Sequence, residues 1–319
     1  MPQIPQVPET PQAPQTSQAP AAGRIAVIGA GAIGGYAAAL AHWAGLDVTL
    51  CVRSPLDGLT IESGDTVRTA AVRVATDPAQ VGPVDWVLLT TKAQDTPSAE
   101  GWLRRLCGPG TAVAVLQNGV GLEERVAPYA PEGTPILPTI VYISAERLAP
   151  GRILHHVASE LHVPEGPLAD RFAALLAGSE LRVRPVADFV TAAWRKLFTN
   201  LAANPVTALL QQRIGVFADP EVAGLARDLL HEAAAVARAE GADIGERDVE
   251  GTLELYALAP PDGGSSMLYD RLAGRPLEHE YITGAVVRAG ERHGIGTPLN
   301  RMLLILLRAI DRELRESAS

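Results

Sequence analysis

Residues 24–53 read RIAVIGAGAIGGYAAALAHWAGLDVTLCVR, and this stretch decides the fold. A short apolar run at 25–28 leads into Gly29-Ala30-Gly31-Ala32-Ile33-Gly34, a small-residue segment typical of a helix follows, and a second apolar run closes the unit. A strand, a tight turn, a helix and a strand form the context in which G-x-G-x-x-G indicates dinucleotide binding. A glycine-rich strand–helix turn without a ligand is the alternative.

Each glycine of this motif has an expected task. Gly29 makes the tight turn, Gly31 lets the backbone approach a pyrophosphate, and Gly34 lets the helix pack closely on the strand. The N-terminus of the helix expected over 35–44 offers free backbone N–H groups to the phosphates, and Ala32 and Ile33 lie in the turn that leads into it. We therefore expect these five residues to bind a cofactor.

The end of the second strand indicates which nucleotide binds. An NAD site usually carries Asp or Glu there, which binds the ribose 2′-hydroxyl, whereas this chain has Arg53 and no acid until Asp57. A guanidinium binds a phosphate through two parallel N–H bonds. The sequence thus favours NADPH over NADH, with Arg53 on the 2′-phosphate; an ordinary solvated loop arginine is the alternative.

Composition excludes several classes of function. The chain has 319 residues and a net charge of −9, with no basic block, so we expect no nucleic-acid partner. Its 2 cysteines, Cys51 and Cys107, form no C-x-x-C or His/Cys cluster, which argues against a metal site or a disulfide framework and favours the reducing cytosol. No apolar run approaches the length of a membrane span.

The N-terminal tail, residues 1–23, is rich in Pro and Gln. It lacks the basic and apolar regions of a signal peptide, and it cannot bury enough apolar surface to offset the entropy of ordering. We expect a disordered extension.

Strands alternating with helices predict a Rossmann-type doubly wound α/β domain over residues 24–186, with edge strands after residue 135. Lys92 follows a buried apolar run at 85–91, and Asn118 follows the next one. Because ligands bind at the carboxyl ends of such strands, we expect both side chains beside the glycine turn, on the cofactor and substrate. A surface lysine and a plain Asn-Gly turn are the alternatives.

The spacing of apolar residues becomes helical near residue 188, which predicts an all-α domain over 187–319. Lys196, Asn200 and Asn204 are spaced i, i+4, i+8 and would form one polar stripe on a helix. Asparagine is a weak helix former, so the stripe favours a functional role over a solvent-facing surface. Asn204 precedes a proline, which predicts a bend there.

Two further candidates in the helical part, Ser266 and Glu278, could equally have a purely structural role. Ser266 stands in a Ser-Ser pair before a helical run, where an N-cap is the default interpretation. Glu278 lies near the start of a predicted helix over 277–293, where a first-turn carboxylate is favourable.

The ordered motifs resemble the 2-dehydropantoate 2-reductase (ketopantoate reductase) family from about residue 24 to 307. They are GAGAIGG, TTKAQDT, LQNGVG, WRKLFTNLAANPVTALL, SSMLYD, GRPLEHEYITG and HGIGTPLN. The resemblance implies a cytoplasmic enzyme that uses NADPH to reduce a 2-oxo acid, such as 2-dehydropantoate, to a 2-hydroxy acid in a cleft between two domains.

The resemblance also implies roles for the residues that match its motifs. Lys196 is the general acid, and Glu278 belongs to the catalytic network. The polar groups of the substrate are held by Asn118, Asn200, Asn204 and Ser266. Lys92 and Asn118 line the nicotinamide side, and Arg53 takes the 2′-phosphate.

The chain departs from the family pattern around the expected substrate. Gly263-Gly264 replaces a segment that is often polar, and Thr283 stands where Asn is usual. The substrate is therefore less certain than the chemistry. An NADP-dependent dehydrogenase for another small hydroxy acid, and a non-catalytic NADP-binding sensor, remain as alternatives. A homodimer is expected only from the base rate among oligomers.

Overall fold

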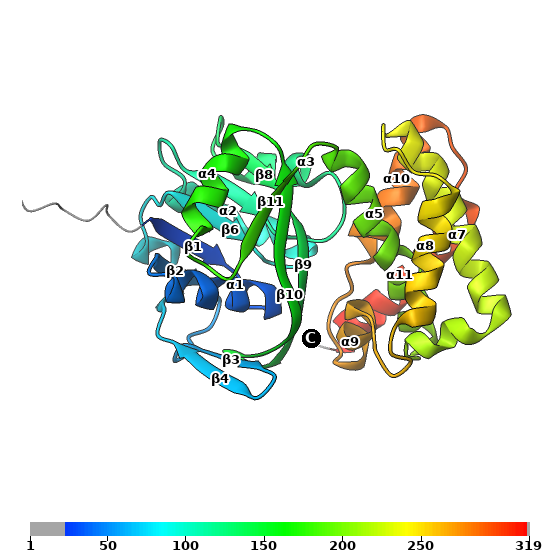
Figure 1. The fold of residues 1–319 in the computed structure, drawn as a ribbon, viewed down its shortest axis with the longest axis horizontal. Coiled ribbons are helices and arrows are strands. Elements are labelled where there is room, and N and C mark those ends of the chain that lie inside the picture. The colour runs from blue at the N-terminus through cyan, green and yellow to red at the C-terminus, as the bar shows by residue number, and fades with distance from the viewer. Residues whose placement is uncertain (1–22, 318–319) are drawn as a thin grey trace, which may run out of the picture.

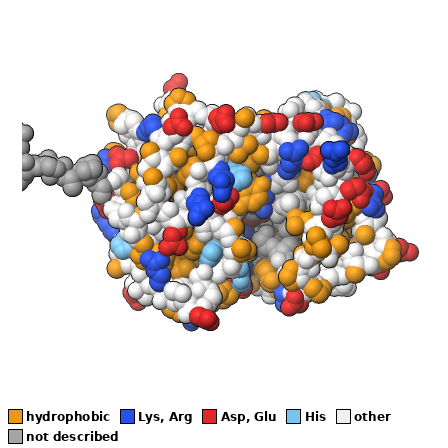
Figure 2. Space-filling model, in the orientation of Figure 1, with side chains coloured by type: hydrophobic (Ala, Val, Ile, Leu, Met, Phe, Trp, Pro, Cys, Tyr) orange, Lys and Arg blue, Asp and Glu red, His pale blue; other side chains and the backbone are white. Residues whose placement is uncertain are grey.

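The structure is a computed structural model that describes residues 23–317, and its two halves lie side by side (Figure 1). The face seen in Figure 2 is hollowed where the halves meet. The predicted disordered tail, apart from Gly23, lies outside the described residues. Among the described helices, none has the length and apolar character needed to cross a membrane.

The N-terminal half is built on a six-stranded parallel sheet of order β5-β2-β1-β6-β7-β8. The strands are β1 (Arg24–Ile28), β2 (Asp47–Cys51), β5 (Arg73–Ala75), β6 (Trp86–Leu89), β7 (Ala112–Val115) and β8 (Ile136–Pro138). Strands β6 and β7 are buried along their whole length, as their continuous apolar sequence requires of a sheet covered on both faces. The expected Rossmann-type fold is confirmed.

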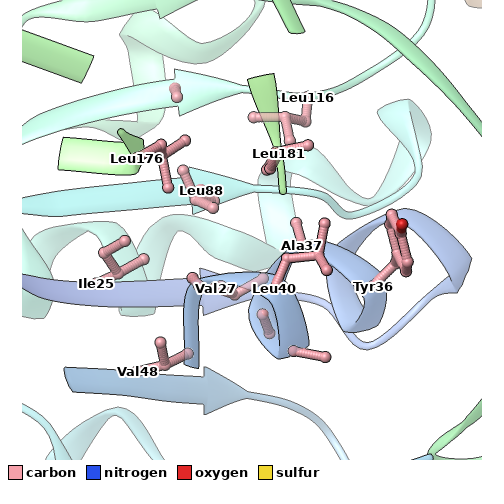
Figure 3. Packing of buried hydrophobic residues seen from close by; sticks show 14 of the residues in the cluster. Ile25, Val27, Tyr36, Ala37, Leu40, Val48, Leu88, Leu116, Leu176 and Leu181 are labelled. Atoms are coloured by element: carbon pink, nitrogen blue, oxygen red, sulfur yellow. The ribbon is translucent and has the colours of Figure 1, made fainter. Parts of the chain in front are cut away.

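Helices cover both faces of this sheet. They are α1 (Ala32–Trp43), α2 (Glu100–Leu106), α3 (Leu122–Val126) and α4 (Pro167–Leu176). On one face, α1 and α4 pack on alternate strand residues, so that Ala37 and Leu40 lie against Ile25, Val27 and Val48 (Figure 3). The other residues of the same strands pack against α2 and α3. This alternation fixes the register of the sheet and the place of its carboxyl edge.

A second sheet corrects the sequence prediction for residues 135–186. Of the strands there, only β8 is an edge strand of the parallel sheet. The second sheet has the order β11-β10-β3-β4, with β9 paired to β10; its strands are β3 (Leu59–Ser63), β4 (Thr66–Ala70), β9 (Ile140–Ala149), β10 (Arg152–Pro164) and β11 (Arg182–Val186). The pairing of β10 with β3 joins segments about ninety residues apart, which local sequence patterns cannot reveal.

The C-terminal half is helical, as expected. Its helices are α5 (Phe189–Leu201), α6 (Ala203–Leu210), α7 (Pro220–Ala239), α8 (Glu246–Leu258), α9 (Ser266–Leu272), α10 (Thr283–His293) and α11 (Pro298–Ser317). One predicted start was wrong: the helix expected from residue 277 begins only at Thr283. Glu278 instead precedes a short 3-10 turn (His279–Tyr281), and contacts with the N-terminal half hold this segment.

Candidate active site

Two glycines of the turn between β1 and α1 stand where a side chain would be strained or would clash. Gly29 has φ +107°, and a Cβ on Gly34 would lie 2.1 Å from both the Gly29 carbonyl oxygen and Thr90 Oγ1. The Thr90 hydroxyl, at the end of β6, donates to the carbonyl oxygens of Ile28 and Gly29 at 2.9 Å each. Thr90 therefore occupies the space that Gly34 leaves free and fixes the turn, a role that the sequence did not indicate.

The N-terminus of α1 fits a phosphate group. A Cβ built on Gly31, the N-cap, would meet no atom within 4 Å, so open space lies in front of the turn. The first-turn N–H groups, which include those of Ala32 and Ile33, have no acceptor within the helix, and no acidic residue is present in that turn. Free donors and the positive end of the helix dipole favour an anion here.

Arg53 lies at the same edge of the sheet. It follows the end of β2, where Cys51 pairs with Ile28 of β1, and its side chain is exposed. Within residues 23–317, no hydrogen bond or ion pair engages its guanidinium. The position and the free donors match those expected of a residue that binds a 2′-phosphate.

Lys92 joins the two halves of the molecule. Its Nζ lies 2.7 Å from Asp270 Oδ2 in α9 and 3.0 Å from Glu278 Oε2. Both carboxylates are nearly buried, whereas 40% of the lysine side chain is exposed. Burial opposes the charge on Lys92, but the two carboxylates outweigh it and raise the pKa of Lys92. Asp270 was missed by the sequence analysis, because one carboxylate within a helix gives no pattern.

Glu278 is held from three sides. Its Oε1 accepts the Ala93 backbone N–H at 3.1 Å, and its Oε2 accepts from Lys92 and from Asn118 Nδ2, the latter at 3.4 Å. Burial works against ionisation, yet the Lys92 charge and these hydrogen bonds hold the pKa of Glu278 below its usual range. The structure thus brings together three residues that the sequence predicted for the site.

The turn that carries Asn118 packs against the segment after Glu278. A Cβ on Gly119, where φ is +96°, would lie 2.4 Å from the Tyr281 carbonyl oxygen. The Arg125 guanidinium donates to the Asn118 carbonyl at 2.9 Å and lies 4.5 Å from the centre of the Tyr281 ring. The close approach of the two backbones explains why glycine follows Asn118.

Lys196 has the opposite surroundings from Lys92. Helix α5 buries Trp194, Leu197 and Phe198 in the helical core, which leaves Lys196 on another side, facing the N-terminal half. Its Nζ lies 5.2 Å from the centre of the Tyr142 ring on β9, and no carboxylate of the described chain forms an ion pair with it. Burial lowers the pKa of Lys196. Tyr142 is a second residue that sequence patterns did not reveal.

The rest of the predicted stripe is divided between two helices. The bend predicted at Asn204 is wrong, because Asn204 lies inside α6. The helices are instead interrupted at Ala202, so that Asn200 lies in the last turn of α5 and Asn204 in the first turn of α6. Asn204 is 2% exposed, and its Nδ2 donates to Ser266 Oγ at 3.5 Å. The amide of Asn200 is half-buried and has no hydrogen-bond partner among the described residues.

The two serines of the Ser-Ser pair, Ser265 and Ser266, have different surroundings. Ser265 is the N-cap of α9, because its Oγ accepts the Leu268 N–H at 3.1 Å and bonds Thr207 Oγ1 at 2.7 Å. Ser266 is exposed and free of that structural task.

Predicted and unpredicted residues together form two clusters where the two halves meet. One consists of Lys92, Asn118, Glu278 and Asp270; the other consists of Lys196 with Tyr142. No hydrogen bond or ion pair joins Lys196 to Glu278 in the part of the chain that is described. The same part contains no group of three or more His, Cys, Asp or Glu side chains arranged to hold a metal ion.

A glycine turn at the carboxyl edge of a parallel sheet, beside a helical half that carries a half-buried lysine, is typical of oxidoreductases of the pyridine-nucleotide class. Two family models match the chain, "Ketopantoate reductase PanE/ApbA" over residues 25–167 and "Ketopantoate reductase PanE/ApbA C terminal" over 188–311. The chain belongs to the ketopantoate reductase family.

Individual relatives span nearly the same length. The 2-dehydropantoate 2-reductase of Caulobacter vibrioides is 44% identical over 89% of this chain and 98% of its own. A PanE/ApbA family ketopantoate reductase from Ralstonia eutropha superposes with a TM-score of 0.84, at 30% identity, over 92% of this chain and 99% of its own. A dimeric ketopantoate reductase from Staphylococcus aureus gives 0.83 at 26% identity, over 91% and 99%.

Proposed function

We propose that the protein reduces 2-dehydropantoate to pantoate with NADPH, and that Lys196 is the general acid. The observation that carries this proposal is the state of Lys196. It is a half-buried ammonium without a carboxylate partner among the described residues, its pKa is lowered, and it lies between the two halves. A lysine in this state gives up a proton more readily than a paired one.

The chemistry requires such a group. The nicotinamide, when bound, supplies a hydride to the carbonyl carbon of the 2-oxo acid. Negative charge then develops on the carbonyl oxygen, where a positioned ammonium both stabilises the charge and delivers the proton. The lowered pKa of Lys196 brings its proton-donating range closer to neutral pH.

The remaining residues are assigned by their positions. We assign residues 24–186 to the cofactor and 187–319 to the substrate. The free amide of Asn200, together with Asn204 and Ser266, holds the polar groups of the substrate. Glu278 orients Lys92 and Asn118 on the nicotinamide side, which the contacts of 3.0 and 3.4 Å support.

The preference for NADPH rests on Arg53 and the turn before it. The exposed guanidinium has no partner among residues 23–317, and no acidic side chain at the end of β2 is placed to bind a ribose 2′-hydroxyl. Arg53→Glu should raise the KM for NADPH at least about 10-fold while leaving that for NADH nearly unchanged. An equal change for both cofactors would show that Arg53 does not bind the 2′-phosphate.

We also propose that the enzyme is a homodimer. The support is the dimeric relative from Staphylococcus aureus, which shares the fold over nearly the whole chain, and the prevalence of two-fold dimers among oligomers.

Oxidation of NADPH, followed by the absorbance of the reduced nicotinamide, tests the activity across a panel of 2-oxo acids. We expect 2-dehydropantoate to give the highest kcat/KM. A higher kcat/KM for another branched or aromatic 2-oxo acid would change the assigned substrate but not the assigned reaction, the reduction of a 2-oxo acid. Tight NADPH binding without turnover of any 2-oxo acid would contradict the proposal and favour a sensor.

A further inference from the structure

Helix α11 has a core face that accounts for part of its apolar sequence. Leu303, Leu304 and Leu307 are all 3% exposed or less, and they pack against the other helices of the C-terminal half. A helix needs only one apolar stripe to hold its place in a globular fold.

The opposite face of α11 is also apolar, and it is uncovered. Met302, Ile305 and Leu306 are 46, 58 and 46% exposed, and Ala309 is exposed as well. Their spacing i, i+3, i+4, i+7 places them in one row, which we call the outer stripe. Scattered exposed apolar residues are common, but a contiguous row over two helical turns marks an interaction surface.

Two arginines beside the outer stripe are paired within the chain. Arg301 pairs with Glu291, and Arg308 donates to both carboxylate oxygens of Glu280 through its Nε and Nη2. No charged residue lies within the stripe itself. The four side chains of the stripe offer no charge to a partner, so an apolar, uncharged surface is their best complement.

We propose that the outer stripe of α11 is the surface through which two copies of this chain pair, stripe against stripe. A two-fold interface uses the same patch on both copies, so the patch must be complementary to itself. A row of uncharged apolar side chains meets this requirement. The proposal rests on the homodimer proposed above and adds the surface that forms it.

Sedimentation velocity of the full-length chain and of Ile305→Glu tests the interface. Each dimer would contain the substitution twice, and two carboxylates would lose water in an apolar contact, so the dissociation constant should rise on the order of 100-fold or more. Leu306→Glu should act alike. Leu258→Glu is the matched control, because Leu258 is an 84% exposed leucine on another helix, α8; this variant should remain dimeric.

The outcomes separate the two proposals. A dimeric wild type, together with Ile305→Glu and Leu306→Glu variants that are monomeric but still folded, supports the stripe. A monomeric wild type overturns both the homodimer and the stripe. A dimeric wild type whose stripe variants stay dimeric overturns only the stripe. Dissociation caused by deleting residues 1–22, with the stripe variants unaffected, would instead assign the contact to the tail.

Discussion

The two lysines of the site have the same side chain and opposite surroundings. Lys92 contacts two nearly buried carboxylates, which raise its pKa, whereas Lys196 contacts the ring of Tyr142 and has its pKa lowered by burial. They are the only lysines in the sequence; the other 25 of its 27 basic residues are arginines. Lysine, unlike arginine, shifts its pKa readily on burial.

The difference suggests separate tasks for the two regions. The carboxylates of Asp270 and Glu278 stabilise the charge on Lys92 and tie it, just after β6, to the helical half. Lys92 is therefore poorly suited to release a proton. The fold destabilises the charge on Lys196, which suits a group that must give a proton to a developing alkoxide. The predictions below test this contrast, beginning with the largest expected effect.

Lys196→Met should lower kcat about 100- to 10,000-fold, because the proton donor and the positive charge are both removed. The dissociation constant of NADPH, measured by fluorescence titration, should change little. Lys196→Arg is the matched control, since it keeps a charge but holds its proton too tightly, and should recover only part of the loss. Turnover close to that of the wild type in Lys196→Met would exclude the general-acid role.

Stability should respond to the two lysines with different signs. Lys92→Met leaves Asp270 and Glu278 without their shared cation, and we expect a loss of about 1–3 kcal/mol in the free energy of unfolding, reduced from the cost for a fully buried pair because Lys92 is partly exposed. Lys196→Met removes a charge that the fold disfavours and should leave that free energy unchanged or higher. Urea unfolding measures both; equal losses would contradict the contrast.

Acid pH should selectively weaken the Lys92 region. Because folding lowers the pKa of Glu278 from its ordinary 4.5, its contribution to stability is fully present above that value and is lost as the pH falls through the lowered one. The difference in unfolding free energy between wild type and Glu278→Gln should therefore narrow at acid pH. Urea unfolding at pH 7 and at progressively lower pH measures it, and a constant difference would show that Glu278 is not ionised in the folded protein.

Tyr142 should have the smallest effect, through Lys196. A ring face near an ammonium favours the charged form by about 0.5–1 kcal/mol. Tyr142→Leu keeps an apolar contact but removes the ring, so the loss of kcat at alkaline pH should begin at a pH lower by less than about one unit. Tyr142→Phe keeps the ring and should stay close to the wild type. The two variants would behave alike if Tyr142 only filled space.

Much of this fold follows from local patterns. The glycine turn, the buried strands before Lys92 and Asn118, and the helical period after residue 188 are each determined by neighbouring residues, and they were predicted. The second sheet was not, because β3 and β10 pair across a long sequence separation. The segment around Glu278 was assigned to a helix because its tertiary contacts, rather than its periodicity, determine its conformation.

The site shows the same limit. Spacing placed Lys196, Asn200 and Asn204 on one stripe, and the bend at Ala202 divides them between two helices. Asp270 and Tyr142, which distinguish the two lysines, come from α9 and β9 and carry no motif of their own. What a lysine contacts across the junction of the two halves depends on how the halves pack, which no local pattern records.

Labelling the protein with lysine carrying ¹³C at Cε would give two resonances, one for each lysine, and Lys92→Arg would assign them. A pH titration by NMR then measures both pKa values in the full-length chain. We predict that the Lys196 pKa lies below the ordinary value of 10.5 and that the Lys92 pKa lies above it. Equal values, or the reverse order, would contradict the assignment of Lys196 as proton donor and Lys92 as the link between the two halves.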